Sequence, residues 1–279
     1  MLGLPADEGG ERPCSPCLVL DGGESMHSVR VEGLKLANVN EYYNTNWSSE
    51  GFKPTGHSWP ELLDCFSRHL PDTGQVLDVG CGDGLTTGPA VQAAGLEYLG
   101  ADVSETGAAS ARANGLETLL IEGADRLPLA NGSVAAIICI EVLEHLFAPQ
   151  DAIREFYRVL EPGGVLLATT PNVSYWRLRA NLLLLGQFNP MGDLESVSRP
   201  WRDPHIRFFT PTTLGSMARE GGFGSVVVEG QRGGFLNGLP VLGRYRASRE
   251  SSHLYRVLQR RWPGMFAYGN VLIARKVEG

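Results

Sequence analysis

Long apolar runs are missing from this sequence, and so is any excess of positive charge. No apolar stretch approaches the roughly 20 residues that a membrane-spanning helix needs. The first ten residues lack the basic segment followed by an apolar one that marks a secretory signal. The formal net charge is −7, which disfavours a nucleic-acid phosphate backbone as a partner. We therefore expect a cytoplasmic protein without a membrane span and without a nucleic-acid partner.

Cysteine is scarce as well. The 279 residues include five cysteines, an odd number that is typical of reduced thiols rather than of a disulfide framework. Cys14 and Cys17 form one C-x-x-C pair, which without a second pair provides half of a zinc site. Cys81 and Cys139 stand beside apolar strand residues, so we expect small core residues there. No feature of the sequence predicts an oligomeric state.

What the sequence does contain is a strand that runs directly into a glycine-rich turn. Residues 76–84 read Val-Leu-Asp-Val-Gly-Cys-Gly-Asp-Gly, and a helix with an early proline, Pro89, is expected to follow. Gly80 and Gly82 let the backbone turn tightly and let a ligand approach the main chain without meeting a Cβ atom. Dinucleotide folds use G-x-G-x-x-G to hold a pyrophosphate, whereas the spacing here is G-x-G-x-G. The turn therefore predicts a ligand without phosphates.

The remainder of the chain alternates between strand and helix patterns. Strands are expected at 76–79, 98–102, 118–122, 135–140, 165–170, 225–229 and 268–276, and helices at 60–70, 104–113, 151–160, 175–185 and 211–220. This alternation predicts a doubly wound α/β domain with a parallel sheet. We expect a flexible tail at 1–37, a helical cap at 38–72 and the α/β domain at 73–279. Insertions at about 172–205 and 232–265 are expected to form a lid over the substrate.

Two segments allow more than one interpretation. Residues 40–59 are rich in Tyr, Trp and Asn, which fits either a cap packed on the core or a lid over a substrate pocket. The run Leu182–Leu185 fits a packed lid helix better than an interfacial membrane face.

The glycine-rich turn resembles motif I of the class I S-adenosylmethionine (SAM) methyltransferases, with Asp78 at the acidic position of the motif. Residues 139–146, Cys-Ile-Glu-Val-Leu-Glu-His-Leu, are similar to a C-x-E-V-L-E-H-L signature of many members. Residues 158–164 resemble the turn before their fifth strand, and together the similar stretches run from about Val76 to Pro171. The resemblance implies a Rossmann-like, mostly parallel sheet of seven strands with an antiparallel last strand, and SAM as cofactor.

Further residues are expected to contact this cofactor. Asp102 ends the second expected strand, where NAD and SAM folds both place an acid that accepts hydrogen bonds from the ribose. Residues 122–133 resemble the family's adenine-binding segment, but Gly123 stands at its aspartate position and Ala135 replaces a second acid. The nearest acids are Glu122 and Asp125. The expected cofactor contacts are Asp78, Gly80, Cys81, Gly82, Asp102, Val103, Ala124, Asp125 and Glu141.

Methyl transfer needs a nucleophile held about 3 Å from the methyl carbon and a means of removing its proton. The candidate catalytic residues are His145, His205 and Glu144. His145 is a candidate general base, because an imidazole titrates near neutral pH. Alternatively, Glu141, Glu144 and His145, spaced i, i+3, i+4, share one face if a helix begins by Glu141. With His205 as a fourth ligand, this set suits a divalent ion such as Mg²⁺. A third interpretation gives these side chains no direct role.

The Glu, Glu, His and distal His set is similar to that of small-RNA 3′-end ribose methyltransferases, and ubiquinone-pathway catechol O-methyltransferases carry a related arrangement. Residues 171–179 and 205–210 also resemble bacterial methyltransferases of cell-envelope saccharide and natural-product pathways. These resemblances imply methyl transfer to a hydroxyl of a small molecule or saccharide. The alternatives are a non-catalytic, methyltransferase-like regulatory partner, a metal-dependent RNA ribose methyltransferase, and a nucleotide-dependent oxidoreductase, which the G-x-G-x-G spacing disfavours.

Overall fold

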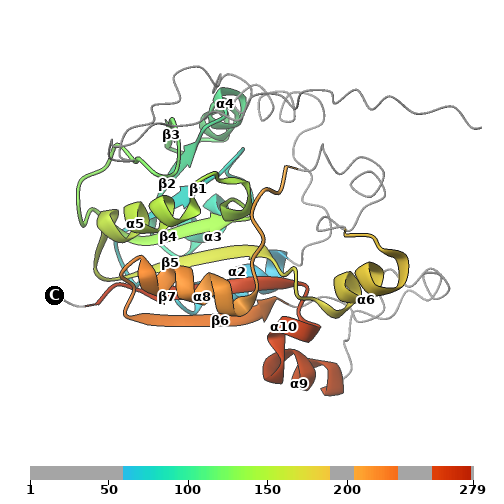
Figure 1. Ribbon diagram of the computed structural model, residues 1–279. Helices are drawn as coiled ribbons and strands as arrows, with labels where there is room; N and C mark the ends of the chain where they lie inside the picture. The colour runs from blue at the N-terminus through green and yellow to red at the C-terminus, as the bar shows by residue number, and fades with distance from the viewer. Residues whose placement is uncertain (1–58, 189–203, 232–252, 278–279) are drawn as a thin grey trace, which may run out of the picture. The chain divides into compact units, whose positions relative to one another are not determined.

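Seven strands form one sheet in the order β3-β2-β1-β4-β5-β7-β6 (Figure 1). The computed structural model describes residues 59–188, 204–231 and 253–277. The strands are β1 (Gln75–Val79), β2 (Glu97–Asp102), β3 (Thr118–Leu120), β4 (Val134–Ile140), β5 (Leu160–Pro171), β6 (Ser225–Gln231) and β7 (Gly269–Arg275). β1 to β5 are parallel, whereas β7 runs antiparallel between β5 and β6. The predicted mostly parallel, Rossmann-like sheet is confirmed.

The central strands are apolar because helices cover both faces of the sheet. All of Val134–Cys139 in β4 and Val76–Val79 in β1 is buried. The strand order reverses between β1 and β4, which lie side by side although β2 and β3 come between them in the chain. In open α/β sheets the ligand binds outside the carboxyl ends of the strands, at such a reversal. The glycine-rich turn follows β1 at this position.

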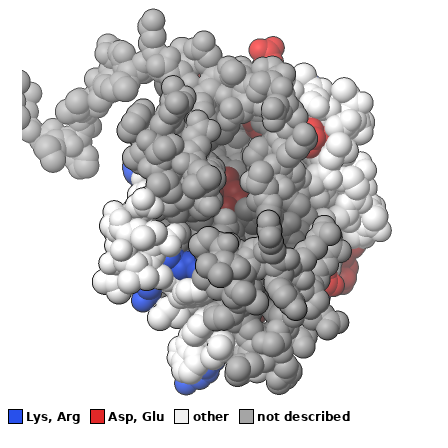
Figure 2. Space-filling view, turned by 90° about the vertical axis from the view of Figure 1, so that its right-hand side faces the viewer, with Lys and Arg blue, Asp and Glu red and all other residues white. Residues whose placement is uncertain are grey.

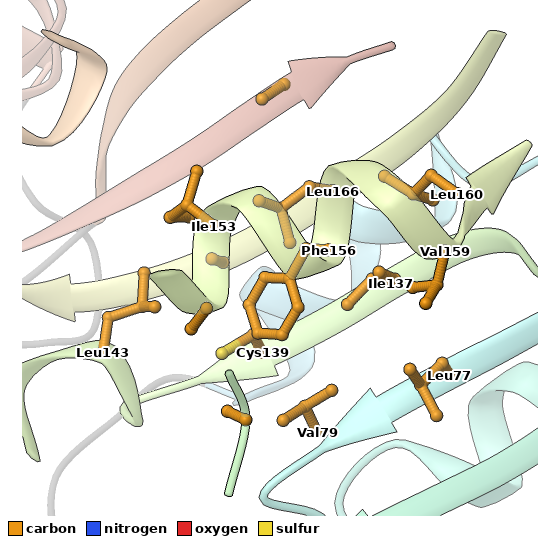
Figure 3. Packing of buried hydrophobic residues seen from close by; sticks show 14 of the residues in the cluster. Leu77, Val79, Ile137, Cys139, Leu143, Ile153, Phe156, Val159, Leu160 and Leu166 are labelled. Atoms are coloured by element: carbon orange, nitrogen blue, oxygen red, sulfur yellow. The ribbon is translucent and has the colours of Figure 1, made fainter. Parts of the chain in front are cut away.

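The described helices are α2 (Trp59–Ser67), α3 (Gly88–Ala93), α4 (Glu105–Ala113), the 3₁₀ turn η1 (Leu143–His145), α5 (Pro149–Val159), α6 (Trp176–Leu185), α8 (Pro211–Glu220), α9 (His253–Arg261) and α10 (Pro263–Phe266). Among them, α2, α3, α5 and α8 contribute to the two clusters of buried residues on the sheet. Ile153 and Phe156 of α5 pack on Ile137 and Leu166 of the sheet, as Figure 3 shows, and Leu214 of α8 joins this cluster. A second cluster contains Phe66 of α2, Val91 of α3, Val76, Ile138 and Leu167.

Several boundaries differ from the prediction. α5 begins at Pro149, two residues before the predicted start, because proline is well tolerated in the first turn of a helix. The turn predicted at 161–164 lies inside β5, since Leu160 already pairs with Val134 ahead of an irregularity in the ladder. Leu182 to Leu185 at the end of α6 are 52–84% exposed, so the prediction that they pack as a lid is wrong for these side chains.

All described residues fall within the unit Ala37–Gly279. The predicted tail, Cys14, Cys17 and the aromatic segment up to residue 58 lie outside the described residues, as do 189–203 and 232–252. The domain boundaries therefore stay predictions. Among the described helices, none combines the length and the apolar character needed to cross a membrane.

Candidate active site

The glycine-rich turn leaves β1 in a conformation that suits glycine. Gly80 has a φ of 75° and Gly82 a φ of 55°. The amide of Gly80 donates to Ala101 O at 2.7 Å, which holds the turn against the end of β2. A Cβ atom at Gly80 would lie 2.4 Å from Val142 Cγ2, so the segment after β4 packs against the same turn. The turn thus gathers the ends of β1, β2 and β4, and Gly80 remains exposed there.

Asp102 lies at the carboxyl end of β2 and faces this turn. Its Oδ2 accepts a hydrogen bond from Gly82 N at 2.7 Å, and its Oδ1 accepts one from Ser104 N at 2.7 Å. Burial raises the pKa of Asp102, and the N–H donors of Ser104 and Gly82 offset part of the rise. Each carboxylate oxygen has a further lone pair. Asp102 therefore joins the turn to α4 and can still accept a hydrogen bond from a ligand hydroxyl. The neighbouring Val103 packs against the hydrophobic core.

The side chain of Asp78 is buried and makes hydrogen bonds within the protein. Its side chain is 3% exposed, and its Oδ2 accepts hydrogen bonds from Thr87 Oγ1 and, at 2.9 Å, from Tyr98 OH. Burial raises the pKa of Asp78 to about 6, although the two hydroxyl donors lower it. Cys81 is buried too, with its Sγ 2.8 Å from where a Cβ at Gly100 would stand. Both side chains are therefore buried next to the glycine-rich turn. A direct contact of either with the cofactor stays a prediction.

The loop after β3 carries the two residues predicted to contact the adenine. Its first residue, Ile121, donates its N–H to Asp102 O at 2.9 Å, so the loop begins beside the ribose-binding candidate. Ala124 is 3% exposed and belongs to the core, whereas Asp125 is exposed. Asp125 Oδ1 lies 2.5 Å from the position that a Cβ at Gly123 would occupy. The Asp125 carboxylate therefore lies over the residue that departs from the family pattern.

Two residues of α5 hold this loop, and the sequence patterns did not single them out. Arg158 donates from Nη1 to Leu129 O at 2.9 Å and from Nη2 to Leu127 O at 3.2 Å. Glu155 Oε1 accepts from Leu127 N at 2.7 Å and from Arg158 Nη2 at 2.7 Å. The only sequence signal was that Arg158 opens the motif before β5.

The segment after β4 departs from the prediction. Glu141 has a φ of 52°, which is uncommon outside glycine, and the single turn η1 starts only at Leu143. The prediction that Glu141, Glu144 and His145 share one helical face is therefore wrong. The N–H of Glu141 instead donates to the backbone and side-chain oxygens of Thr169 in β5, each at 3.2 Å. Such backbone strain clusters at functional sites.

Glu144, His145 and His205 nevertheless converge. Glu144 Oε1 lies 4.0 Å from His145 Nε2 and 3.8 Å from His205 Nε2, and the two ring centroids are 4.7 Å apart. One ligand atom from each residue lies within 4.8 Å of the other two. These separations are too long for hydrogen bonds. They are close to the roughly 3–4.4 Å between two atoms that each lie about 2.2 Å from a shared ion.

Among the described residues, only the two imidazoles lie close enough to offset the charge of Glu144, and they do so only when protonated. Glu144 is 1% exposed, and neither carboxyl oxygen has a hydrogen-bond partner among the described residues. Burial, and then the Glu141 carboxylate, raise the pKa of Glu144 well above its usual range. A cation beside Glu144 would oppose both effects, so a buried carboxyl with two imidazoles fits a divalent ion. Figure 2 shows where acidic atoms, in red, lie on one face of the molecule.

Backbone contacts fix the imidazoles. His145 Nδ1 lies 3.2 Å from Pro204 O, 59 residues away in the chain. Because a carbonyl oxygen only accepts, Nδ1 carries a proton, and Nε2 lies on the side of Glu144. In the neutral ring Nε2 then has the free lone pair. The N–H groups of Ile206 and Arg207 both donate to Glu144 O at 3.0 Å. The structure therefore places the predicted His205 beside η1. The Glu141 carboxylate adds negative charge near Glu144, but Glu141 is not one of the three converging residues.

Comparison with known proteins gives the context of this site. Residues 77–168 match a family model described as a methyltransferase domain. A ubiquinone biosynthesis O-methyltransferase of Methylococcus capsulatus is 31% identical over 213 residues, which cover 73% of this chain and 84% of that protein. Its counterpart in Chromobacterium violaceum is 27% identical over 208 residues, covering 72% and 87%. A SAM-dependent methyltransferase of Thermotoga maritima, described as a possible histamine N-methyltransferase, shares the fold with a TM-score of 0.56 and 20% identity, covering 86% and 97%.

Proposed function

This chain belongs to the class I SAM-dependent methyltransferases, and we propose that it transfers the methyl group to a hydroxyl oxygen of a small molecule. The names of the relatives, ubiquinone biosynthesis O-methyltransferases, support a hydroxyl acceptor. The observation that carries the proposal is the convergence of Glu144, His145 and His205. A hydroxyl must lose its proton as it attacks a methyl group, and these side chains provide groups that assist this loss.

The residues around the glycine-rich turn form the cofactor side of the proposed site. SAM supplies an electrophilic methyl group bound to a sulfonium. In the proposal, Asp102 accepts hydrogen bonds from the ribose hydroxyls, and the exposed main chain of Gly80 leaves room for the amino-acid part. Asp125 accepts a hydrogen bond from the adenine amino group in the space above Gly123, and Glu141 lies beside the cofactor.

His145 Nε2 has two proposed roles that exclude each other, because one lone pair serves both. As a general base, Nε2 takes the proton of the acceptor hydroxyl, while the contact from Nδ1 to Pro204 O keeps the ring oriented. As a metal ligand, Nε2 binds a divalent ion together with Glu144 and His205. Such an ion, when bound, lowers the pKa of a coordinated hydroxyl and orients two neighbouring oxygens.

We favour the metal-binding role. A base alone leaves unexplained why the Glu144 carboxyl is buried without a hydrogen-bond donor among the described residues. A shared ion also uses His205 Nε2, which lies 3.8 Å from the same oxygen, whereas the base role uses His145 alone. A metal of this kind suits an acceptor with adjacent hydroxyls, such as a catechol or a saccharide diol. A cytoplasmic location stays part of the proposal.

The test is methyl transfer from isotopically labelled SAM to a panel of catechols and saccharide diols, with the product identified by mass spectrometry. We expect one methyl group on a hydroxyl oxygen, loss of product with EDTA, and recovery with added Mg²⁺. Product formation that is unaffected by EDTA would support His145 as base. Tight SAM binding without product on any acceptor would overturn the proposal and favour a regulatory partner. Methylation of an RNA 3′ end alone would favour the ribose methyltransferase alternative.

A further inference from the structure

Two asparagines with no assigned role lie where β5 ends and β7 begins. Asn172 follows β5 directly, and Asn270 is the second residue of β7. Asn172 is 1% exposed and Asn270 is 0% exposed. A buried amide is costly unless its hydrogen bonds are made, so its partners reveal what it holds together. The partners of these two asparagines lie in stretches that are distant in the chain.

Asn172 connects the start of α6 to α10. Its Oδ1 accepts from Ser174 N at 3.0 Å and lies 2.6 Å from Ser174 Oγ. Its Nδ2 lies 3.2 Å from Pro263 O, 3.3 Å from Gly264 O and 2.8 Å from Ala267 O. A single side chain thus binds both the first predicted insertion, through Ser174, and the end of the second.

Asn270 connects β5 and β7 to the stretch that carries His205. Its Nδ2 donates to Thr170 Oγ1 at 3.1 Å and to Pro171 O at 3.2 Å, and it lies 3.4 Å from Phe209 O. Phe209 O also accepts from Val173 N at 3.1 Å, and Asn172 pairs with Phe209 as an isolated parallel bridge. Phe209 is therefore the point where the side chain of Asn270 and the backbone of Asn172 meet the His205 stretch.

The other end of this stretch is bound to Glu144. Ile206 N and Arg207 N donate to Glu144 O, each at 3.0 Å, and Pro204 O contacts the His145 ring at 3.2 Å. Residues 204–209 are therefore anchored at the front by η1 and at the rear by the two asparagines. Phe209 follows Arg207 by two residues, so a shift of Phe209 pulls on the hydrogen bonds that hold Ile206 and Arg207 to Glu144 O, and through them on the neighbouring His205.

We infer that Asn270 is a positioning residue for His205, on which its side chain acts through Phe209. The Asn172 side chain supports this arrangement indirectly, because it holds the turn from Asn172 to Ser174, whose backbone pairs with Phe209. This inference rests on the proposed function in so far as His205 belongs to the acceptor side of the site. Asn172 also binds the carbonyl oxygens of α10 through its side chain. One group of hydrogen bonds therefore fixes the positions of both α10 and the stretch that carries His205. The cofactor residues on β1 and β2 lie outside this network.

The first test needs neither acceptor nor metal. The imidazole signals of isotopically labelled histidine are recorded by NMR, and the signal of His205 is identified by its loss in His205→Ala. We expect Asn270→Ala to shift or broaden the His205 signal, and Asn172→Ala to do so less, because the Asn172 side chain donates to Ala267 O and not to Phe209 O. Gln150→Ala is the matched control, because Gln150 Nε2 also donates to a backbone carbonyl, Met217 O at 3.3 Å, but joins α5 to α8. It should leave the His205 signal unchanged.

The second test separates positioning from general destabilisation. We expect the S-adenosylhomocysteine Kd of both variants to stay within about twofold of the wild-type value, while the acceptor KM of Asn270→Ala rises about tenfold. An unchanged His205 signal in Asn270→Ala would overturn the inference. So would an equal loss of cofactor and acceptor affinity. Asn270→Ser, which keeps a hydroxyl donor, replaces Asn270→Ala if that variant does not fold, and failure of both to fold would show a purely structural role. If the wild-type protein methylates no hydroxyl, the proposed function fails, yet the NMR result still decides the inference.

Discussion

The carboxylate of Asp125 lies over Gly123, with its Oδ1 2.5 Å from the position of a Cβ at that glycine. Gly123 stands where the resemblance to the adenine-binding segment of methyltransferases predicts an aspartate. Because Gly123 has no side chain, the carboxylate of Asp125, two residues further along the chain, occupies the space beside it. A carboxylate is thus available near the expected place even though the sequence pattern is broken.

Replacing Gly123 with alanine should weaken cofactor binding. The new Cβ would displace the Asp125 carboxylate, which moves easily because it is the end of an exposed side chain, so the fold should be preserved. We expect calorimetry to show a rise of about tenfold in the S-adenosylhomocysteine Kd, because one hydrogen bond to a charged group is lost. Asp125→Asn should have a similar effect. Glu122→Gln, at the other nearby acid, is the control. A larger effect of Glu122→Gln than of Asp125→Asn would show that Glu122 is the adenine contact.

The Asp78 carboxyl should make stability depend on pH in a defined direction. Its pKa is about 6 in the folded protein against an ordinary 3.8, so the folded state binds the proton more tightly than the unfolded state. Stability from this group is therefore greatest below about pH 4 and falls as the pH rises to about 6, by about 3 kcal/mol. Asp78→Asn stays neutral and lacks this dependence. Urea unfolding of both proteins between pH 4 and 8 measures the difference, and parallel stability profiles would contradict the assignment.

Glu144→Gln should abolish stabilisation by a divalent ion. At a Mg²⁺ concentration about 100-fold above its Kd, the wild-type melting temperature should rise by roughly 5–10 °C. The variant should show no rise and should lose more than about 100-fold in activity, with unchanged affinity for S-adenosylhomocysteine. Because protons leave Glu144 as the ion binds, wild-type metal affinity should increase with pH. Asp151→Asn, at an exposed carboxylate of α5, is the control. An equal thermal shift in wild type and Glu144→Gln would place the ion elsewhere.

Arg158→Ala should loosen the loop that carries Asp125. The guanidinium binds two loop carbonyls and Glu155, so its removal leaves several polar groups without a partner. We expect a loss of about 2–4 kcal/mol in unfolding free energy and a weaker cofactor affinity. Arg154→Ala on the same helix removes an exposed pair with Asp151 and should cost less than about 0.5 kcal/mol. Denaturant unfolding and calorimetry measure both quantities. Equal effects of the two substitutions would show that Arg158 does not position the loop.

The sheet was predictable because local spacing separates strands from helices. The short apolar runs of β1 and β4, each bounded by turn residues, predict buried strands without knowledge of any distant contact. Placing β7 antiparallel beside β5 needed the resemblance to a known fold, since nothing in Gly269–Arg275 specifies its partners. The same holds for Asp102, whose place at a strand end follows from the sequence, whereas its bonds to Gly82 and Ser104 do not.

The acceptor side of the site was less predictable, because long-range contacts determine it. Glu141 has a left-handed backbone and bonds to Thr169, so the condition for a shared helical face, a helix that begins by Glu141, is not met. His205 reaches Glu144 because backbone N–H groups of Ile206 and Arg207 bind Glu144 O. A sequence shows a histidine in such a stretch, but it does not show which carbonyl oxygen its backbone binds.

Calorimetric titration with S-adenosylhomocysteine, in EDTA and then with Mg²⁺ and a catechol, tests cofactor binding and the metal site together. We expect micromolar binding of S-adenosylhomocysteine in both conditions and binding of the catechol only when the metal is present. His205→Ala should retain the first binding event and lose the second. Binding of the catechol in EDTA at undiminished affinity would contradict the metal site at Glu144, His145 and His205. Absence of S-adenosylhomocysteine binding would contradict the methyltransferase function itself.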